Sequence, residues 1–144
     1  YRKGDLYFYH NTVVYLRNGD NTVFNVSTIE ETLHAHQNVI HSYNGEIIML
    51  SGDGRAILDT NFLTENWTPT TTGSAGIVEV NENIEGNDPI LWDVNSEDYR
   101  LGPGSPARNI GMQLPWPMED LQYQYKYHFY QYLALLYYNF LKFF

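Results

Sequence analysis

The chain has 144 residues, a formal net charge of -9 and no cysteine, and 43% of its residues are hydrophobic. The acidic balance argues against nucleic acid or an anionic membrane surface as the main partner, because both need clustered Lys and Arg. The composition allows one buried core in one domain and excludes disulfide bonds and thiol chemistry.

A pattern that ends in asparagine occurs three times in residues 1–63. The copies align on Asn11, Asn38 and Asn61, which are 27 and 23 residues apart, a spacing typical of solenoid proteins. Apolar residues stand five and three positions before each Asn and two positions after it, alternating with mostly polar or amphipathic ones. This alternation predicts strands with one buried face. The nine residues expected in the core are Leu6, Phe8, Val13, Leu33, Ala35, Ile40, Ala56, Leu58 and Leu63.

Each of these asparagines comes where the alternation ends. An Asn side chain at a corner can replace hydrogen bonds that the turning backbone loses. If the copies stack in register, the side-chain amides also bond to one another. The pattern therefore predicts an asparagine ladder along one corner of the stack.

Short turn sequences separate these strands from further β-branched and aromatic runs. Turns are predicted at residues 17–21, 42–45 and 51–54, and additional strands at residues 22–26 and 46–50. The gaps are too short for crossover helices. Strands that recur in the same order without helices favour an all-β fold, a right-handed parallel β-helix. An antiparallel sandwich is the alternative.

A polar loop is predicted at residues 66–76, before a short strand at residues 77–80. Long loops on rigid scaffolds often carry binding sites. Trp67 in this loop could stack on a sugar ring, which makes it a candidate carbohydrate-binding residue. The alternative is that Trp67 folds back over the apolar side of its coil.

Residues 88–111 carry the most specific motif of the chain. An Asp-Pro and an aromatic residue lead to Asp-Tyr-Arg-Leu, then to Gly-Ser-Pro-Ala and a final Gly. The residues of this motif are Asp88, Pro89, Trp92, Asp93, Asp98, Tyr99, Arg100, Leu101, Gly104, Ser105, Pro106, Ala107 and Gly111.

This motif resembles the closing segment of secreted right-handed parallel β-helix proteins, notably polysaccharide lyases and related carbohydrate-active proteins. The resemblance covers about residues 4–111 and departs at Asn109, where such proteins often have Asp. It implies a segment that closes the last coil, and in it Asp98 and Arg100 are expected to pair with each other. It also implies a secreted or extracellular location.

The aromatic-rich segment after Pro117 shows no family pattern. We therefore divide the chain into β-helix coils with their closing segment at residues 1–111 and a C-terminal extension at residues 112–144. The extension is expected to be buried, to bind a partner or another copy, to lie on a membrane, or not to be native to the family. The chain begins at Tyr1 without an initiating Met or signal peptide, which indicates a fragment or a processed product.

Five side chains on the outward columns are predicted to form a carbohydrate-binding patch. They are Tyr7 and Tyr9 in the first copy, His34 and His36 in the second, and Asp59 in the third. Stacked coils lie about 4.8 Å apart, so these side chains would be neighbours. Tyrosine rings can stack on sugars, and imidazoles can form hydrogen bonds or transfer protons. The alternative is an ordinary solvent-exposed face.

Metal binding has weaker support. His34 and His36 point the same way on one strand, but no fixed zinc-ligand spacing is present. Acidic residues within 93–98 offer oxygen ligands for Ca²⁺ without the full calcium-loop spacing. We predict no metal site and no cofactor, with Ca²⁺ as the candidate exception. The residues that could complete a zinc site are His10, His41 and Asp59.

The sequence favours a carbohydrate-active β-helix protein of one of two kinds. One is the C-terminal part of a polysaccharide lyase or glycoside hydrolase, and the other is a noncatalytic module for glycan binding, adhesion or scaffolding. A lyase needs a base and a cation that neutralises the substrate carboxylate, and the coils offer only Arg17 and Arg55. This chain alone is therefore expected to lack a full active site. Its expected partner is a polysaccharide or oligosaccharide.

Overall fold

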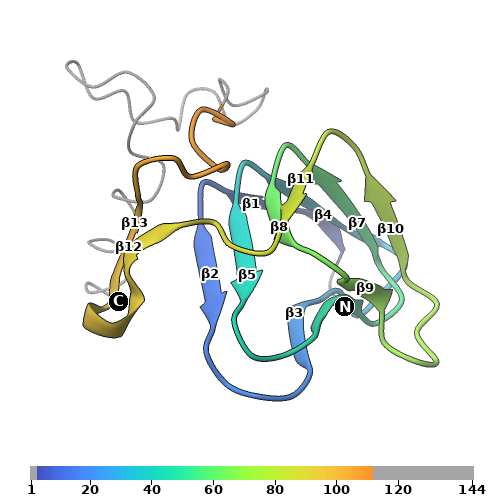
Figure 1. Ribbon diagram of the computed structural model, residues 1–144. Helices are drawn as coiled ribbons and strands as arrows, with labels where there is room; N and C mark the ends of the chain where they lie inside the picture. Colours follow the sequence, from blue (N-terminus) through green and yellow to red (C-terminus); the bar gives the residue numbers. More distant parts are fainter. Residues whose placement is uncertain (1–2, 112–144) are drawn as a thin grey trace, which may run out of the picture.

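The computed structural model describes residues 3–111, which form a parallel β-solenoid (Figure 1). Eight parallel strand pairings and one antiparallel pairing connect its strands, and the described residues contain no α-helix. The predicted parallel β-helix is confirmed, and the antiparallel sandwich is wrong. The strands are β1 (Gly4–Tyr9), β2 (Thr12–Tyr15), β3 (Asn21–Asn25), β4 (Glu31–His36), β5 (Val39–Ser42), β6 (Ile47–Ser51), β7 (Arg55–Asp59), β8 (Phe62–Thr64), β9 (Thr68–Thr70), β10 (Ile77–Val80), β11 (Ile84–Gly86), β12 (Leu91–Asp93) and β13 (Asp98–Leu101).

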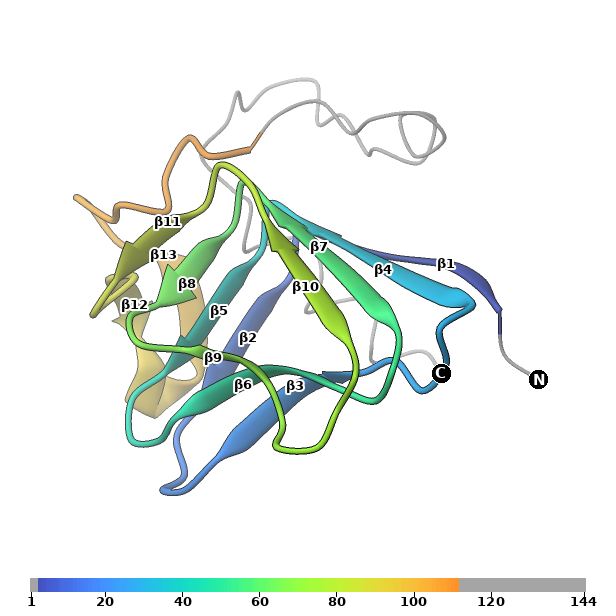
Figure 2. The ribbon, with the colours of Figure 1, turned by 90° about the vertical axis from the view of Figure 1, so that its right-hand side faces the viewer.

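Three parallel sheets surround the core like the sides of a prism (Figure 2). Sheet A contains β1, β4, β7 and β10 in that order, and sheet B contains β2, β5, β8 and β11. Sheet C contains β3, β6 and β9. Each of the first three coils supplies one strand to every sheet, and the fourth coil supplies β10 and β11. Coils stack because each strand pairs with the corresponding strand of the next coil.

The stacking register is the one that the asparagine alignment predicts. Leu6 pairs with Leu33, Leu33 with Ala56, and Ala56 with Val78. Val78 belongs to a fourth copy of the pattern, centred on Asn83, which the alignment missed. The copy was missed because its position two residues after the Asn is a charged Glu instead of an apolar residue.

The core contains the predicted inward residues of the second and third copies, all of them 0% exposed. The first copy is different, since Leu6 is 56% exposed and Phe8 and Val13 are only partly buried. The first coil has a described coil on one side only, so its inward residues are less completely covered than those of the inner coils. The fully buried residues of the two inner copies are Leu33, Ala35, Ile40, Ala56, Leu58 and Leu63.

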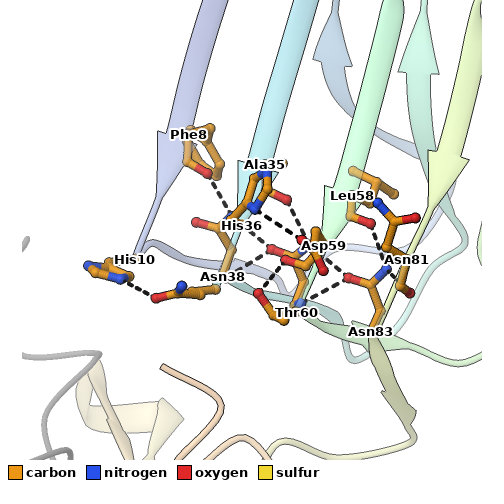
Figure 3. Close-up of polar contacts among 12 residues, drawn as sticks. Phe8, His10, Ala35, His36, Asn38, Leu58, Asp59, Thr60, Asn81 and Asn83 are labelled. Atoms are coloured by element: carbon orange, nitrogen blue, oxygen red, sulfur yellow. Dashed lines mark hydrogen bonds and ion pairs between the residues drawn. The ribbon is translucent and has the colours of Figure 1, made fainter. Parts of the chain in front are cut away.

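An asparagine ladder runs along the corner between sheets A and B, as predicted (Figure 3). The Asn38 side-chain amide donates to Asn61 Oδ1 at 2.9 Å and to Phe8 O at 2.8 Å. Asn61 Oδ1 also accepts the Asn38 backbone N–H at 2.9 Å. Each inner Asn therefore satisfies the backbone of one neighbouring coil and the side chain of the other, although Asn38 and Asn61 are 0% exposed.

The residue before each of the first three asparagines has a left-handed backbone. The φ angles are 58° at His10, 58° at Gln37 and 52° at Thr60. This conformation turns the chain from sheet A into sheet B within two residues. It is costly for a β-branched residue such as Thr60, because the branched side chain crowds the backbone.

A second corner, between sheets B and C, brings neighbouring coils very close together. A Cβ atom built on Gly45 would lie 2.1 Å from Gly19 O and 2.8 Å from Asn21 Nδ2. The Asn21 side chain is 0% exposed and donates to Gly19 O at 2.9 Å. Only glycine fits at position 45, since any side chain would push the two turns apart.

The loop predicted at residues 66–76 is wrong in its first part, which contains β9. This strand pairs with β6 through Thr68 and Thr70, on either side of Pro69. Proline lacks a backbone donor, which made a strand improbable from sequence. It is tolerated here because β9 is the edge strand of sheet C. The short strand predicted after the loop is present as β10.

The closing segment lies along the side of sheet B (Figures 1 and 2). Strands β12 and β13 form an antiparallel hairpin around the 3₁₀ helix Val94–Ser96, beside sheet B (Figures 1 and 2). Ala107 packs against Val39 and Phe62 from the second and third coils. These two residues lie next to inward-facing Ile40 and Leu63 and so face outward. The segment therefore covers the outer side of sheet B.

The predicted pairing within this segment is confirmed. Arg100 Nε donates to Asp98 Oδ1 at 2.7 Å, and a second bond joins Arg100 Nη2 to Asp98 Oδ2. The guanidinium carbon also lies 5.5 Å from the centre of the Trp92 ring. The pair holds the pKa of the Asp98 carboxyl below its ordinary value, mainly through the hydrogen bond from Arg100.

The predicted C-terminal extension at residues 112–144 lies outside the described residues. Within residues 3–111, no helix is long and apolar enough to cross a membrane.

Replacing Asn61 with Ala is expected to lower the free energy of unfolding by about 3 kcal/mol. The change removes the acceptor of the buried Asn38 backbone N–H and the side-chain donor to Ala35 O, and each buried group left unpaired costs about 1–3 kcal/mol. Urea unfolding followed by circular dichroism measures the effect. Asn11→Ala, at the end of the ladder, is the matched control and should cost much less. Equal losses at both positions would contradict the ladder's role.

Replacing Thr60 with Asn is expected to raise the free energy of unfolding by about 1 kcal/mol. Asn tolerates a positive φ better than a β-branched residue does, so the backbone strain decreases. Thr32→Asn in strand β4 is the control, and it should lower stability because Asn is a poor strand former. A lower free energy of unfolding for both variants would contradict the conclusion that the backbone is strained at Thr60.

Candidate functional site

The outward side of sheet A brings together the five predicted patch residues Tyr7, Tyr9, His34, His36 and Asp59. Tyr7 pairs in register with His34, Tyr9 with His36, and His36 with Asp59. These residues stand two positions apart on their strands, so their side chains share one face. We call this group the tyrosine–histidine face.

Ring contacts connect the four aromatic members of the face. The Tyr7 and His34 rings stack with centroids 5.1 Å apart and planes 18° apart. Tyr9 meets His36 edge-on at 4.9 Å, and the two histidine rings stack at 6.3 Å. The face is therefore a packed layer of rings and not a set of independent side chains.

Carboxylates fix the orientation of both imidazoles. His34 Nε2 lies 2.9 Å from Asp5 Oδ1, and His36 Nδ1 lies 3.5 Å from Asp59 Oδ2 (the latter pair in Figure 3). Asp5 was not predicted as part of the site. Its signal was present in the sequence, because Asp5 stands one alternation step before Tyr7 on the same face.

Burial divides the face into an accessible half and a covered half. Tyr9 was predicted to offer its ring to a sugar. It is only 9% exposed, so its ring has no free surface for stacking. Burial is the largest cause of two pKa shifts in the face. It raises the pKa of the Tyr9 hydroxyl and lowers the pKa of the His36 imidazole. Tyr7 is half-buried, and 25% of the His34 side chain is exposed. Tyr7 and His34 are thus the aromatic members that a ligand can reach.

A fourth-coil residue borders the face and was missed with the fourth copy of the pattern. Glu79 stands in register with Ile57 and forms an ion pair with Arg55, at 2.5 Å between Oε1 and Nη2. Glu79 is found from sequence once Asn83 is recognised as the fourth corner. The acidic groups near the face are thus more numerous than predicted.

Trp67 lies apart from the tyrosine–histidine face. Its ring packs against the hydrophobic core, and its Nε1–H donates to Glu85 Oε1 at 2.9 Å. The alternative prediction, a Trp folded back over the apolar side of its coil, is confirmed. The Trp ring therefore stabilises the third and fourth coils.

The predicted metal ligands are separated or already engaged. Among residues 3–111, no group of three or more His, Asp or Glu side chains could hold a metal ion. His10 Nε2 contacts Gln37 Oε1 at 2.5 Å. Asp93, a candidate calcium ligand, accepts hydrogen bonds from the backbone N–H and the hydroxyl of Ser96.

A separate open depression of about 620 Å³ lies between the hairpin and the turn after β5. Trp92 is 59% exposed and Tyr43 is 39% exposed at its rim. Their rings are on the closing segment and sheet B, away from the tyrosine–histidine face. This second aromatic surface provides a matched control for tests of the face.

Comparison of this chain with protein-family models, with curated proteins and with solved structures finds no match.

Stability is expected to fall as the pH decreases below about 6.5. Burial is the largest cause that lowers the pKa of His10, His36 and His41 in the folded protein. An unfolded His has a pKa of about 6.5, so below that pH the unfolded chain binds more protons and is favoured. The stabilisation is complete above pH 6.5 and is lost as the pH falls through the lower folded pKa values.

Urea unfolding at pH 7.5 and pH 5.5 measures this dependence. His41 is 1% exposed and neither ring nitrogen has a hydrogen-bond partner among the described residues, so His41→Phe should reduce the loss at pH 5.5. A wild-type protein that is equally stable at both pH values, or more stable at pH 5.5, would contradict the prediction.

Proposed function

We propose that this protein binds a neutral glycan through the tyrosine–histidine face of sheet A, as a noncatalytic β-solenoid module. The observation that supports this most is the stacked pair of Tyr7 and His34, held in place by Asp5. An accessible ring beside oriented polar groups is the arrangement that sugars need, since they offer an apolar face and peripheral hydroxyls. Asp5 and Asp59 supply acceptors for those hydroxyls.

The charge of the face favours a neutral ligand. Asp5, Asp59 and Glu79 are carboxylates on or beside the face, and the bordering cation Arg55 is paired with Glu79. A polysaccharide rich in carboxylates would be repelled by this negative charge. A neutral glycan avoids this repulsion.

A second candidate function is catalysis, in line with the resemblance to polysaccharide lyases. His36 is the residue that favours it, because Asp59 lies at Nδ1 and burial lowers the imidazole pKa, so that His36 is a neutral base at pH 7. The other ring nitrogen, Nε2, has no hydrogen-bond partner among the described residues. In this reading the chain is the C-terminal part of an extracellular lyase or hydrolase.

Replacing Tyr7 with Ala is expected to weaken binding of a neutral polysaccharide about tenfold. Loss of one stacking ring costs roughly 1.4 kcal/mol, which is a factor of ten in affinity. Affinity electrophoresis through gels containing neutral or acidic polysaccharides measures the binding. Trp92→Ala removes an exposed ring elsewhere and should leave binding unchanged. If Trp92→Ala weakens binding and Tyr7→Ala does not, the face is not the site.

The same polysaccharides distinguish the two candidate functions. The migration of a noncatalytic module is slowed by the polysaccharide in the gel, and no new polysaccharide chain ends are produced. Unsaturated products or new reducing ends that disappear in His36→Ala would favour the enzyme instead.

A further inference from the structure

The two ends of the asparagine ladder differ from its middle in a complementary way. In the middle, the Asn61 side-chain amide donates to Ala35 O in the coil before and to Asn83 Oδ1 in the coil after. Asn38 repeats this arrangement with Phe8 O and Asn61 Oδ1. An inner Asn thus needs a carbonyl from one neighbouring coil and a side-chain oxygen from the other.

At the first end, Asn11 lacks the coil before it within the described residues. Its side-chain amide donates to Tyr9 O, two residues back in its own coil, at 2.8 Å. Its Oδ1 accepts no hydrogen bond from any described residue, whereas the same oxygen of Asn38 accepts two. Asn11 therefore has an unused acceptor, equivalent to the oxygen with which Asn38 bonds to the coil before it.

At the other end, Asn83 lacks the coil after it within the described residues. Its backbone N–H and its side-chain amide both turn to Asn81 O, at 2.6 Å and 3.1 Å (Figure 3). In the inner coils these two donors go to the Oδ1 of the next asparagine. In the fourth coil these two donors thus bond to an oxygen of their own coil, and the first coil has an unused oxygen equivalent to the one that accepts them in the inner coils.

The strands at the two ends have the same complementarity. Strands β1 and β10 are the two edges of sheet A, and strands β2 and β11 are the two edges of sheet B. Each pairs with its one neighbour in parallel. Apolar side chains are exposed at both ends, with Leu6 at 56% and Val80 at 48%. A fourth coil that meets a first coil can therefore continue both the strand pairing and the ladder.

We propose that two copies of this chain associate head to tail, with the fourth coil of one copy stacked on the first coil of the other. Sheets A and B continue across the joint, through β10 on β1 and β11 on β2. Asn83 of one copy donates to Asn11 Oδ1 of its neighbour. The contact is heterologous, so each added copy presents a new free end and the assembly does not stop at a dimer.

Glu85 keeps this association weak. It is in register with Leu63, at a position occupied by Val13, Ile40 and Leu63 in the first three coils. At the joint Glu85 stands opposite Val13, so stacking removes a carboxylate from water next to an apolar residue. Charged residues of this kind limit edge-to-edge pairing in β-proteins.

Sedimentation velocity of the 144-residue protein over a range of concentrations tests the proposal. The mean mass is expected to rise with concentration without a plateau at the dimer, and Glu85→Val should shift this rise to about tenfold lower concentration. If the wild-type protein and Glu85→Val both remain monomeric at all concentrations, the proposal is overturned.

Two variants locate the contact at the first coil. The carbonyls of Asn11 and Tyr15 bond to the second coil, so by alternation the N–H of Val14 faces the open side. Val14→Pro removes that donor and should abolish association, whereas Val14→Thr keeps the donor and is the matched control. Asn11→Ala should weaken association about tenfold.

The melting temperature of each dilute variant checks that it folds. Association that is unaffected by both Val14→Pro and Asn11→Ala would place the contact elsewhere on the chain and overturn the proposal.

Discussion

A β-solenoid must turn its backbone at every corner, and each turn leaves N–H and C=O groups without strand partners. The asparagine ladder supplies those partners at the corner between sheets A and B, from side chains that are fully buried in the inner coils. Because each amide bonds to the coils on both sides, the ladder also fixes the register of one coil on the next. That register stacks Tyr7 on His34 and places Asp59 beside His36. The candidate site therefore depends on an interaction that lies outside it.

The fold of the first three coils could be predicted from sequence because one period-two pattern recurs around Asn11, Asn38 and Asn61. Such a pattern reports burial, and burial is what sets the register. The fourth coil was not recognised as a copy of the pattern, although its strand β10 was predicted, because Glu85 replaces the apolar residue at an end where little needs covering. Strand β9 escaped because its backbone pairs beside a proline, which an edge strand tolerates. In both cases an edge position accommodates a residue that is unfavourable inside a stack of strands, a charged residue in one case and a proline in the other.

The candidate site was predictable in position and less so in accessibility. Alternation assigned all five residues to one face, and the structure places them there. Alternation cannot show how far a side chain is covered, so Tyr9 was predicted to be available and is buried. The closing segment illustrates the same gap. Its motif predicted the Asp98–Arg100 pair, which is local, but not that Ala107 would pack on sheet B, which is a long-range contact.

The regular stacking of the coils has a consequence for how such a surface can change. Each coil contributes one row of two outward side chains to the face, as Tyr7 with Tyr9 and His34 with His36 do. A duplication or loss of one whole coil would preserve the ladder and lengthen or shorten the face by a single row, about 4.8 Å. Surface length would then vary in fixed steps while the core stays the same. For a linear polymer of repeating units, the number of coils would then set how many units the face can contact.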